Sequence, residues 1–379
     1  MPLPSAPRLL FAVTTDLCFD QRMQRICGSL AAAGYQVQLV GWQRPASPPL
    51  TPQPYQQHRL RGWFQKGKLF YLEYNLRLLI YLLSQHAAAW CACDLDTALP
   101  VWLRARLGGQ PLVYDAHELF TEVPEVVARP AVQRVWRWVE GFIVPRARLA
   151  YTVGPALAGV FEQRYGRPFG VVRNVSRLRE QDVLPPAPSA APAGGYILYQ
   201  GALNVGRGLE NLLDAMPQVA GRLVICGEGD LSAALRARAD RLGLLESGKV
   251  EFRGFVLPET LREVTRHAAV GIMLLENIGL SYYYSLANKF FDYVHAGIPQ
   301  VLIDFPEYRT LNDEFDVAEL VTDLAPATLA RALNRLLRDE PARYQHLAAN
   351  CRRAAPELSW QHEERALRQY WAQVVPLAE

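Results

Sequence analysis

Short runs of β-branched and aromatic residues alternate along this chain with segments whose apolar positions recur every three to four residues. This alternation is typical of parallel β-α units, in which each strand is followed by a helix that covers the sheet. In the first half the predicted strands are Leu9–Val13, Gln36–Val40, Trp90–Cys93, Leu112–Tyr114, Ala150–Val153 and Gly170–Val172. In the second half they are Tyr196–Tyr199, Leu223–Cys226, Val250–Phe252, Gly271–Leu274, Val301–Ile303 and Leu320–Val321.

The two series are separated by residues 184–195, LPPAPSAAPAGG, which are rich in Pro, Ala and Gly and lack periodicity. This composition predicts an interdomain linker. The chain of 379 residues is also long enough for two ordinary domains. We therefore predict an α/β protein with an N-terminal Rossmann-like domain (1–183), the linker, a C-terminal Rossmann-like domain (196–355) and a last helical segment (356–379) that packs back towards the N-terminal domain.

The segment Ser281–Pro299, SYYYSLANKFFDYVHAGIP, is the most informative part of the chain. It predicts a helix that stops at Gly297, with Asn288 and Asp292 on one face and Lys289 beside them. A helix N-terminus that carries an amide, an ammonium group and a carboxylate suits a nucleotide diphosphate. An amphipathic helix with a solvated polar face explains the same residues equally well.

Several loops after predicted strands carry reactive side chains, where ligands bind in open α/β sheets. Arg207 lies in the glycine-rich turn YQGALNVGRGL just before a predicted helix, Glu228 in the loop CGEGD, and His117 in YDAHE. Arg22 and Arg25, one helical turn apart, are candidates for contact with an anionic acceptor. The alternatives are a turn without a ligand, a helix cap, a structural histidine and a solvated helical turn.

Composition and charge narrow the function classes. Half of the residues are apolar, a fifth are charged and the net charge is +3 without a Lys/Arg tract, which indicates a globular protein that does not bind nucleic acid. Six scattered cysteines indicate reduced thiols in a cytosolic chain. The pair Asp94 and Asp96 resembles a DxD metal site, but a helix N-cap at Asp96 is the simpler explanation, and we predict no metal.

The N-terminus has no signal-peptide pattern, and the most hydrophobic window, Leu69–Leu83, is short and contains Glu73 and Arg77. We therefore expect a cytoplasmic protein. Residues 59–83 mix basic and aromatic side chains beside an apolar helix, a pattern that suits peripheral contact with the inner membrane face. A buried helix preceded by a basic loop is the alternative.

Taken together, the motifs resemble those of the retaining GT-B glycosyltransferases, specifically glycosyltransferase family 4 (group 1), over nearly the whole chain. The resemblance is carried, in the family's order and spacing, by DAHE (115–118), YxG with RGLENLLDA (199–215), GEGD (227–230), NKFFDYVHAGIP (288–299) and DFPE (304–307). It implies two domains with sheets facing an interdomain cleft, the first on the acceptor side and the second holding the donor. It also implies metal-independent and cofactor-free transfer of a sugar from a nucleotide diphosphate-sugar to an acceptor hydroxyl, with retention of configuration.

The resemblance also assigns residue roles. Arg207 falls where the family has its diphosphate-binding Lys, Asp292 on the acidic residue that holds the ribose, and His117 on the histidine that contacts the transferred sugar. The expected catalytic residues are His117, Arg207 and Lys289, and the expected substrate-binding residues are Gly201, Glu228, Tyr284, Ser285, Asn288 and Asp292.

Three departures from the family pattern leave alternatives open. Ala202 replaces the usual phosphate-binding Arg, and Tyr284 replaces the first Glu of the E-x7-E motif. TTDLCFDQR stands where a GG loop is usual, which predicts a remodelled acceptor side. The acceptor is expected to be a carbohydrate or lipid-linked sugar in polysaccharide or glycolipid synthesis. A sugar-nucleotide epimerase and a non-catalytic sugar-nucleotide-binding protein are the other functions considered.

Overall fold

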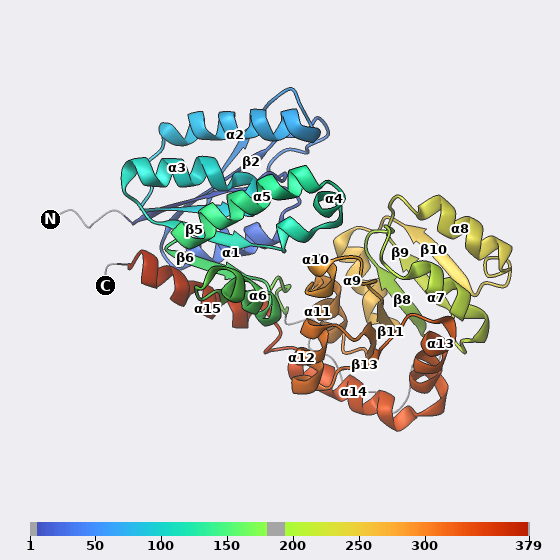
Figure 1. The fold of residues 1–379 in the computed structure, drawn as a ribbon. Coiled ribbons are helices and arrows are strands. Elements are labelled where there is room, and N and C mark those ends of the chain that lie inside the picture. Colours follow the sequence, from blue (N-terminus) through green and yellow to red (C-terminus); the bar gives the residue numbers. More distant parts are fainter. Residues whose placement is uncertain (1–5, 180–193, 378–379) are drawn as a thin grey trace. The chain divides into compact units, whose positions relative to one another are not determined.

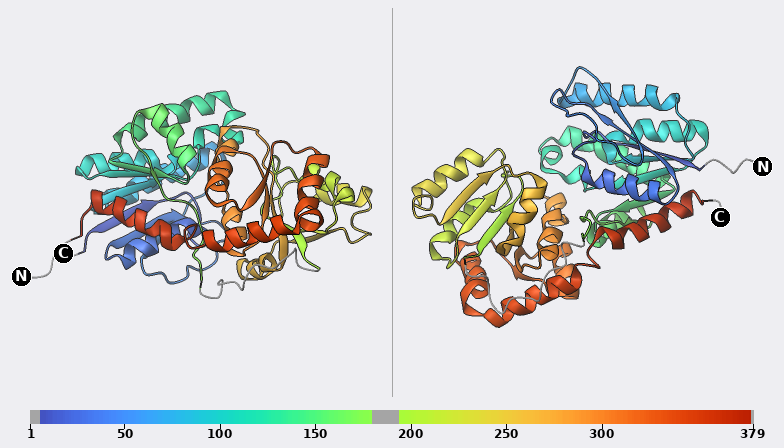
Figure 2. Two further views of the ribbon diagram at one scale, coloured as in Figure 1. Left: turned by 90° about the horizontal axis from the view of Figure 1, so that it is seen from below. Right: turned by 180° about the vertical axis from the view of Figure 1, so that it is seen from behind.

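The computed structural model describes residues 6–179 and 194–377, which divide into two compact units (Figure 1). Unit 1 comprises Met1–Asn174 and Glu363–Glu379, and unit 2 comprises Val175–His362. Each unit contains one parallel β-sheet with helices on its faces (Figures 1 and 2). The prediction of two Rossmann-like domains is confirmed. Most of the predicted linker, residues 184–193, lies outside the described residues.

The sheet of unit 1 has seven strands in the described residues, in the order β3-β2-β1-β4-β5-β6-β7. They are β1 (Arg8–Ala12), β2 (Gln36–Trp42), β3 (Gln56–Leu60), β4 (Ala89–Cys93), β5 (Leu112–Ala116), β6 (Leu149–Thr152) and β7 (Gly170–Val171). All six predicted strands are present. The strand β3 was not predicted, because QQHRL lies at the sheet edge, pairs only with β2 and has no apolar run.

The helices of unit 1 lie on both faces of its sheet (Figures 1 and 2). They are α1 (Gln21–Ala32), α2 (Gly67–Leu83), α3 (Ala98–Gly108), α4 (Pro124–Val127), α5 (Pro130–Ile143), α6 (Pro155–Tyr165) and α15 (Trp360–Val374). The ring of Trp102 on α3 packs 4.8 Å from Phe142 of α5, and Tyr71 of α2 packs 5.9 Å from Trp136 of α5. These contacts join α2, α3 and α5 into one layer.

The last helix, α15, returns to unit 1 although unit 2 precedes it in the chain. The indole ring of Trp371 lies 5.0 Å from the ring of Phe11 in β1. Tyr35 donates a hydrogen bond of 2.7 Å to the carbonyl of Val375, and Ser29 donates one of 2.8 Å to Glu364. The C-terminal segment therefore contributes to the core of the first unit.

The sheet of unit 2 has the order β10-β9-β8-β11-β12-β13. Its strands are β8 (Tyr196–Gln200), β9 (Leu223–Cys226), β10 (Val250–Gly254), β11 (Ala268–Met273), β12 (Gln300–Ile303) and β13 (Ala318–Val321). Its helices are α7 (Leu209–Ala215), α8 (Ser232–Arg241), α9 (Pro258–Arg266), α10 (Leu280–Tyr283), α11 (Asn288–His295), α12 (Pro306–Phe315), α13 (Pro326–Asn334) and α14 (Pro341–Ala354). All six predicted strands of this half are present.

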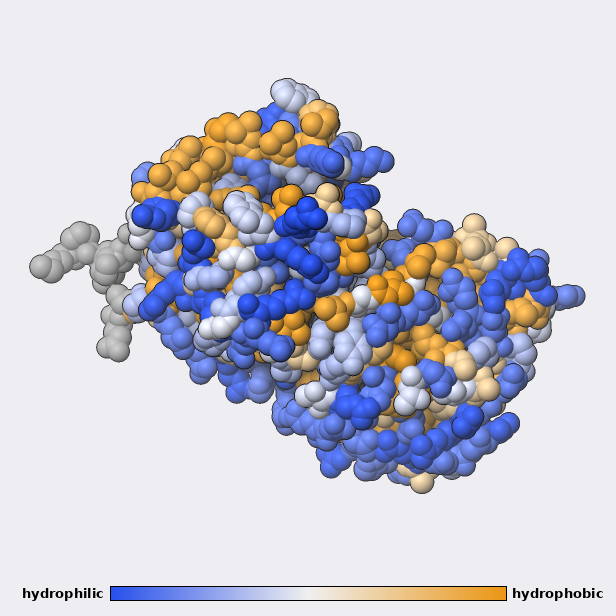
Figure 3. All heavy atoms as spheres, viewed as in Figure 1, coloured by the Kyte–Doolittle hydropathy of each residue, from blue (hydrophilic) through white to orange (hydrophobic). Residues whose placement is uncertain are grey.

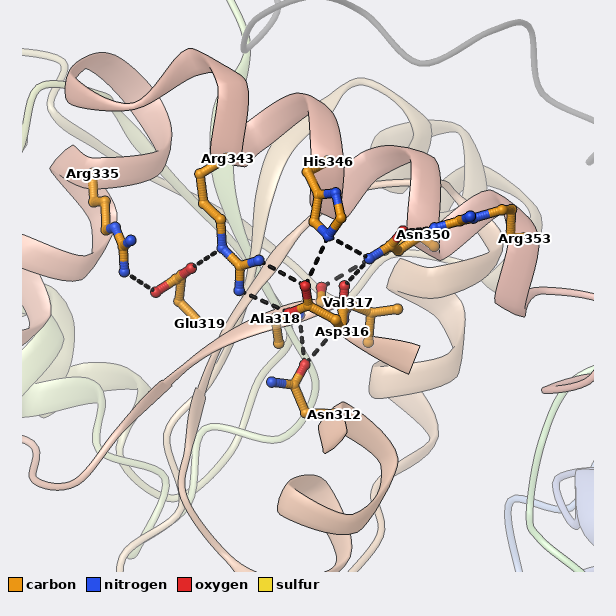
Figure 4. Close-up of polar contacts among 11 residues, drawn as sticks. Asn312, Asp316, Val317, Ala318, Glu319, Arg335, Arg343, His346, Asn350 and Arg353 are labelled. Atoms are coloured by element: carbon orange, nitrogen blue, oxygen red, sulfur yellow. Dashed lines mark hydrogen bonds and ion pairs between the residues drawn. The ribbon is translucent and has the colours of Figure 1, made fainter. Parts of the chain in front are cut away.

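A charged network ties the last strand of unit 2 to the helices beside it (Figure 4). Asp316 follows α12 in a left-handed conformation (φ +47°) and accepts hydrogen bonds from Arg343 at 2.7 and 2.8 Å and from His346 at 2.9 Å. Arg343 also donates to Glu319 of β13 at 2.6 Å, and Arg335 donates to the same carboxylate at 2.9 Å. Because each carboxylate accepts hydrogen bonds from two side chains, α14 is held firmly against the sheet edge.

All six cysteines are free thiols, and five of them are buried, in agreement with the predicted reduced state. Over the ranges 6–179 and 194–377, no helix is both long enough and apolar enough to span a bilayer.

Candidate active site

Two glycine-containing loops meet at the carboxyl ends of β8 and β9 in unit 2. Gly201 follows β8 with φ +131°, and its N–H donates to the carbonyl of Cys226 at 2.9 Å. A Cβ atom on Gly227 would lie 1.9 Å from the carbonyl oxygen of Gly201. Only glycine allows so close an approach of the two loops, which brings the backbone of both to one edge of the sheet.

The predicted helix in the segment Ser281–Pro299 is α11, which begins at Asn288 and ends before Gly297 at φ +67°. Its start is held in place by Tyr308, whose hydroxyl accepts a hydrogen bond from the N–H of Ala287 at 3.2 Å. Asn288 is exposed in the first helical position. The helix and its C-terminal signal are therefore as predicted.

Lys289 extends from the first turn of α11 towards Gly201. Its Nζ would lie 3.0 Å from a Cβ atom placed on Gly201, and it stands 3.9 Å from the ring centroid of Tyr199. Burial, together with the positive charge of Arg207, lowers the pKa of Lys289 to about 7, although Asp292 acts in the opposite direction. Among the described residues, Nζ has no hydrogen-bond acceptor and no ion-pair partner.

Arg207, in the glycine-rich turn after β8, is the second cation of this site. Its guanidinium lies 5.0 Å from the ring centroid of Tyr282, and its Nε is buried without a hydrogen-bond partner in the described part of the chain. The described residues provide no carboxylate that pairs with it. Two neighbouring cations without a carboxylate partner form a site that an anion stabilises, and a diphosphate has the charge and the acceptor oxygens to do so.

Asp292 lies one turn after Lys289 and is fixed by side chains from outside α11. Its carboxylate accepts hydrogen bonds from Gln200 at 3.0 Å and from Ser176 at 3.2 Å. Gln200 is itself oriented by Thr265, whose hydroxyl donates to it at 2.8 Å. Ser176 and Gln200 carried no sequence signal, because their importance depends on a contact with a residue about 90 to 120 positions away.

The structure thus brings Gly201, Arg207, Lys289 and Asp292 together. The hydroxyl of Ser285 donates to the carbonyl of Tyr282, whose ring lies beside Arg207, at 2.8 Å. Tyr284 follows the short helix α10 and is half-buried, with its ring centroid 5.1 Å from that of Tyr283. Glu228 faces solvent and pairs with Arg236 at 3.1 Å. Three aromatic rings of the site were not predicted from the sequence. Lys289 lies over the ring of Tyr199 and Arg207 over that of Tyr282, and Tyr308 accepts a hydrogen bond from the backbone before α11.

His117 belongs to unit 1 and follows β5, as expected. Its Nδ1 lies 3.4 Å from the carboxylate of Asp94 and its Nε2 lies 3.3 Å from that of Asp115. Its backbone N–H also donates to Asp94 at 2.8 Å. Burial alone would lower the pKa of His117, but the two carboxylates outweigh burial and raise it to about 9. The imidazole ring is therefore a cation at neutral pH.

Two expectations for unit 1 are wrong. Arg22 does not point to an acceptor, because its guanidinium forms a buried ion pair of 2.7 Å with Asp115. Arg25 is half-buried and donates to Asn174 at 2.6 Å, and its contact with an anionic acceptor stays a prediction. Asp96 is not a helix N-cap, because it accepts a hydrogen bond of 2.6 Å from Thr14 and the cap of α3 is Thr97.

The residues that come nearest to a metal-binding arrangement in unit 1 are Cys93, Asp115 and His117, whose ligand atoms lie within 4.8 Å of one another. No other such group occurs in the described residues. The guanidinium of Arg22 already pairs with Asp115, and its positive charge opposes a metal cation at this position.

Both halves of the chain match family models of glycosyltransferases. Residues 21–175 match "Glycosyltransferase Family 4", and residues 194–339 match "Glycosyl transferases group 1". No curated protein matches the chain in sequence.

Solved structures match nearly the whole chain at low identity. Sucrose-phosphate synthase from Thermosynechococcus elongatus is 18% identical, with a TM-score of 0.77 over 97% of this chain and 98% of that one. Anabaena Alr3699/HepE in complex with UDP-glucose is 15% identical (TM-score 0.74, 97% and 100% covered). WaaG, a glycosyltransferase of lipopolysaccharide biosynthesis, is 15% identical (TM-score 0.69, 97% and 99% covered). The likenesses confirm the GT-B fold.

Proposed function

We propose that this chain, a glycosyltransferase with the GT-B fold, transfers a sugar from a nucleotide diphosphate-sugar to an acceptor hydroxyl with retention of configuration. The observation that carries the proposal is the pair of cations Arg207 and Lys289, which lack carboxylate partners in the described residues. The solved complex of HepE with UDP-glucose and that of a trehalose-6-phosphate protein from E. coli with UDP-2-fluoro glucose support a donor of this class.

In the proposed mechanism the protein stabilises the charge that develops on the leaving diphosphate. The guanidinium of Arg207, the ammonium of Lys289 and the N-terminus of α11 surround the position of the diphosphate. The reaction then needs correct placement of donor and acceptor more than it needs a nucleophilic side chain. We propose that neither a metal nor a cofactor takes part.

Lys289 supplies the cation that Ala202 removes from the usual pattern. Its ammonium lies against Gly201, next to Ala202 in the chain, and over the ring of Tyr199. Tyr199 in turn donates a hydrogen bond of 2.8 Å to the carbonyl of Ala202. Through these three contacts the ammonium group of Lys289 lies at the turn that carries Ala202. This position supports the proposal that Lys289 takes the place of the missing phosphate-binding Arg.

The remaining roles complete the proposal. Asp292 binds the ribose hydroxyls, Glu228 lies near the base, and His117 contacts the transferred sugar. The donor also meets backbone and polar groups of Ser285, Asn288 and Gly201. Tyr284 stands in place of the usual glutamate and therefore alters the contact with a sugar hydroxyl. The acceptor is a carbohydrate or a lipid-linked sugar in polysaccharide or glycolipid synthesis, at the cytoplasmic face of a membrane contacted through residues 59–83.

The decisive test is turnover by Arg207→Ala. Loss of one charge-stabilising donor should lower the rate of transfer by a factor on the order of 10²–10³. Arg222→Ala is the matched control, because Arg222 is an exposed Arg of the same unit that pairs with Glu251. Near-normal transfer by the Arg207 variant would remove the proposed role. A thermal-shift screen of UDP-, GDP-, ADP- and TDP-sugars identifies the donor, since binding energy adds to folded-state stability.

Two results would favour the alternative functions. Formation of an isomeric sugar nucleotide without any acceptor would indicate an epimerase. Calorimetric binding of the donor without transfer to any acceptor of a broad panel would indicate a binding protein, the alternative that Ala202 and Tyr284 motivate.

A further inference from the structure

Helix α2 is apolar on two opposite faces, and only one of them is buried. Phe70, Tyr74, Leu78 and Leu82 pack into unit 1. Leu69, Leu72, Leu76, Ile80 and Leu83 follow one another at intervals of three or four residues, and each is at least half exposed. Leu72 and Ile80 are 68% and 61% exposed. A helix that is apolar on two opposite faces normally has both of them covered, so this second face lacks the cover that its composition predicts.

The apolar surface continues on the neighbouring helices of the same layer. Leu107 at the end of α3 is exposed, as are Val135 and Trp138 of α5. Trp138 stacks on Phe142, which in turn packs against Trp102 of α3. Figure 3 shows the hydrophobic residues gathered over α2. We call Leu69, Leu72, Leu76, Ile80 and Leu83, together with Leu107, Val135 and Trp138, the apolar face.

The charges around the apolar face are positive. Residues 59–86 carry five Lys and Arg and a single carboxylate, Glu73. Glu73 is already engaged, because it accepts hydrogen bonds from the N–H groups of Trp63 and Phe64 and from Arg77 at 2.9 Å. Residues 129–148 carry five Arg and one carboxylate, which is fully buried. Each segment therefore has a net charge of +4. Arg59 is buried against Asp16 and Arg137 pairs with Glu122, whereas Arg61, Lys66 and Lys68 are exposed.

This positive charge distinguishes between two possible partners of the apolar face, a second copy of the chain and a lipid bilayer. A second copy of the chain docked face to face would bring two sets of cations together, and like-charge juxtaposition opposes association. An anionic bilayer offers acyl chains to the leucines and negative headgroups to the cations at once. Trp63, 82% exposed just before α2, has the amphipathic ring that favours the membrane–water interface.

We propose that the apolar face docks on the surface of an anionic lipid bilayer, with Arg61, Lys66 and Lys68 in the headgroup region. The docking itself needs no bound donor. It rests on the proposed function in one respect only, because it makes a lipid-linked sugar the acceptor class of that transferase.

The test measures co-flotation of the full chain with vesicles. Vesicles of phosphatidylcholine with phosphatidylglycerol should bind the protein, and vesicles of phosphatidylcholine alone should bind it at least tenfold more weakly. The variant Leu72→Gln/Ile80→Gln should lose at least tenfold in binding to the anionic vesicles. Leu257→Gln, at an equally exposed leucine of unit 2, is the control and should bind as the unchanged protein does.

The charges are tested separately with Lys66→Gln/Lys68→Gln, which should weaken binding to anionic vesicles and reduce its sensitivity to salt. Equal binding to neutral and anionic vesicles, or no binding to either, overturns the proposal. A dimer in solution that Leu72→Gln/Ile80→Gln dissociates, without vesicle binding, assigns the face to a second copy instead. The thermal shift caused by the donor must persist in every variant, so failure of docking is distinguishable from failure of donor binding.

Discussion

The carboxylate of Asp94 lies 3.4 Å from Nδ1 of His117 and accepts the backbone N–H of the same residue at 2.8 Å. Asp94 makes these contacts from a backbone with φ +59° and ψ 174°, a region that is essentially restricted to glycine and costs other residues about 1–3 kcal/mol. Burial raises the pKa of Asp94 to about 6, while that of His117 is raised to about 9. The pair is therefore fully charged only between these two pH values.

Because the backbone of Asp94 is strained, we expect its Gly variant to be more stable than its Ala variant, the reverse of the usual order. Asp94→Gly should be more stable than Asp94→Ala by about 1–3 kcal/mol, because only glycine adopts this backbone without strain. Denaturant unfolding measures the difference. At Asp240, in the helix α8, the order should be the usual one, with Ala more stable than Gly. The same order at both positions would show that Asp94 is not strained.

The same two variants separate stability from activity. Both lose the carboxylate that holds His117, so both should lose transfer activity on the order of 10²-fold, the effect of a catalytic group misplaced by about 1 Å. In both, the pKa of His117 measured by NMR should fall below about 9. An active Asp94→Gly protein with an unchanged His117 pKa would contradict a positioning role for Asp94.

The network around Asp316 predicts a purely structural effect (Figure 4). Arg343→Met removes the hydrogen bonds to Asp316 and Glu319 and should lower the free energy of unfolding by about 1–3 kcal/mol. Donor affinity should not change. Arg343 holds the pKa of Asp316 below its ordinary value, so this part of the stability is present above about pH 4 and is lost as the pH falls. In the variant, acid should therefore reduce stability less than in the unchanged protein.

Hydrophobic periodicity predicted every core strand because parallel strands buried on both faces are continuous apolar runs, such as LLFA in β1 and LVIC in β9. It missed β3, which is half covered and polar. Helix α11 was predictable because its end is marked locally by Gly297. The strand ends also indicated Gly201, Arg207 and His117, since the topology alone places such loops at the ligand edge.

The partners of the site residues could not be predicted from local patterns. The contact of Lys289 with Tyr199, and the hydrogen bonds of Gln200 and Ser176 to Asp292, join segments that are distant in the chain. Arg22 was predicted to contact an anionic acceptor because it lies in the first β-α connection, although the long-range ion pair with Asp115 buries it. Asp94 was judged only as a metal ligand, because its backbone conformation is invisible in the sequence.

Gly201→Ala tests how closely Lys289 approaches the turn after β8. The new Cβ would lie 3.0 Å from Nζ, so the ammonium group must move, and donor affinity should fall about tenfold, as for loss of one charge-assisted contact. Gly243→Ala is the control, because φ there is also positive (+66°) but a Cβ would meet no atom within 4 Å. Both variants should lose stability through backbone strain, and only the first should lose affinity. Equal donor affinities would argue against the contact.

Lys289→Met should stabilise the ligand-free protein while it weakens donor binding. The ammonium is half-buried beside Arg207, so its removal at pH 7 should raise Tm by about 2–4 °C. Since the folded pKa lies below the unfolded one, this group makes the native state more stable as pH rises from 7 towards 10, and the variant should lack that rise. Lys249→Met, at the other lysine of unit 2, removes a hydrogen bond to Val219 and should not raise Tm.

Donor binding should also take up a proton at Lys289. The pKa of about 7 means that roughly half of the free protein carries a neutral amine at pH 7, and most of it does at pH 8. A bound diphosphate favours the ammonium form, so binding should take up about half a proton at pH 7 and nearly one at pH 8. Affinity should then fall by up to about tenfold for each pH unit above 7. Calorimetry in buffers of different ionisation enthalpy measures the uptake, with the nucleotide that gives the largest thermal shift. The Lys289→Met protein should show none of it, and uptake that persists there would place the titrating group elsewhere.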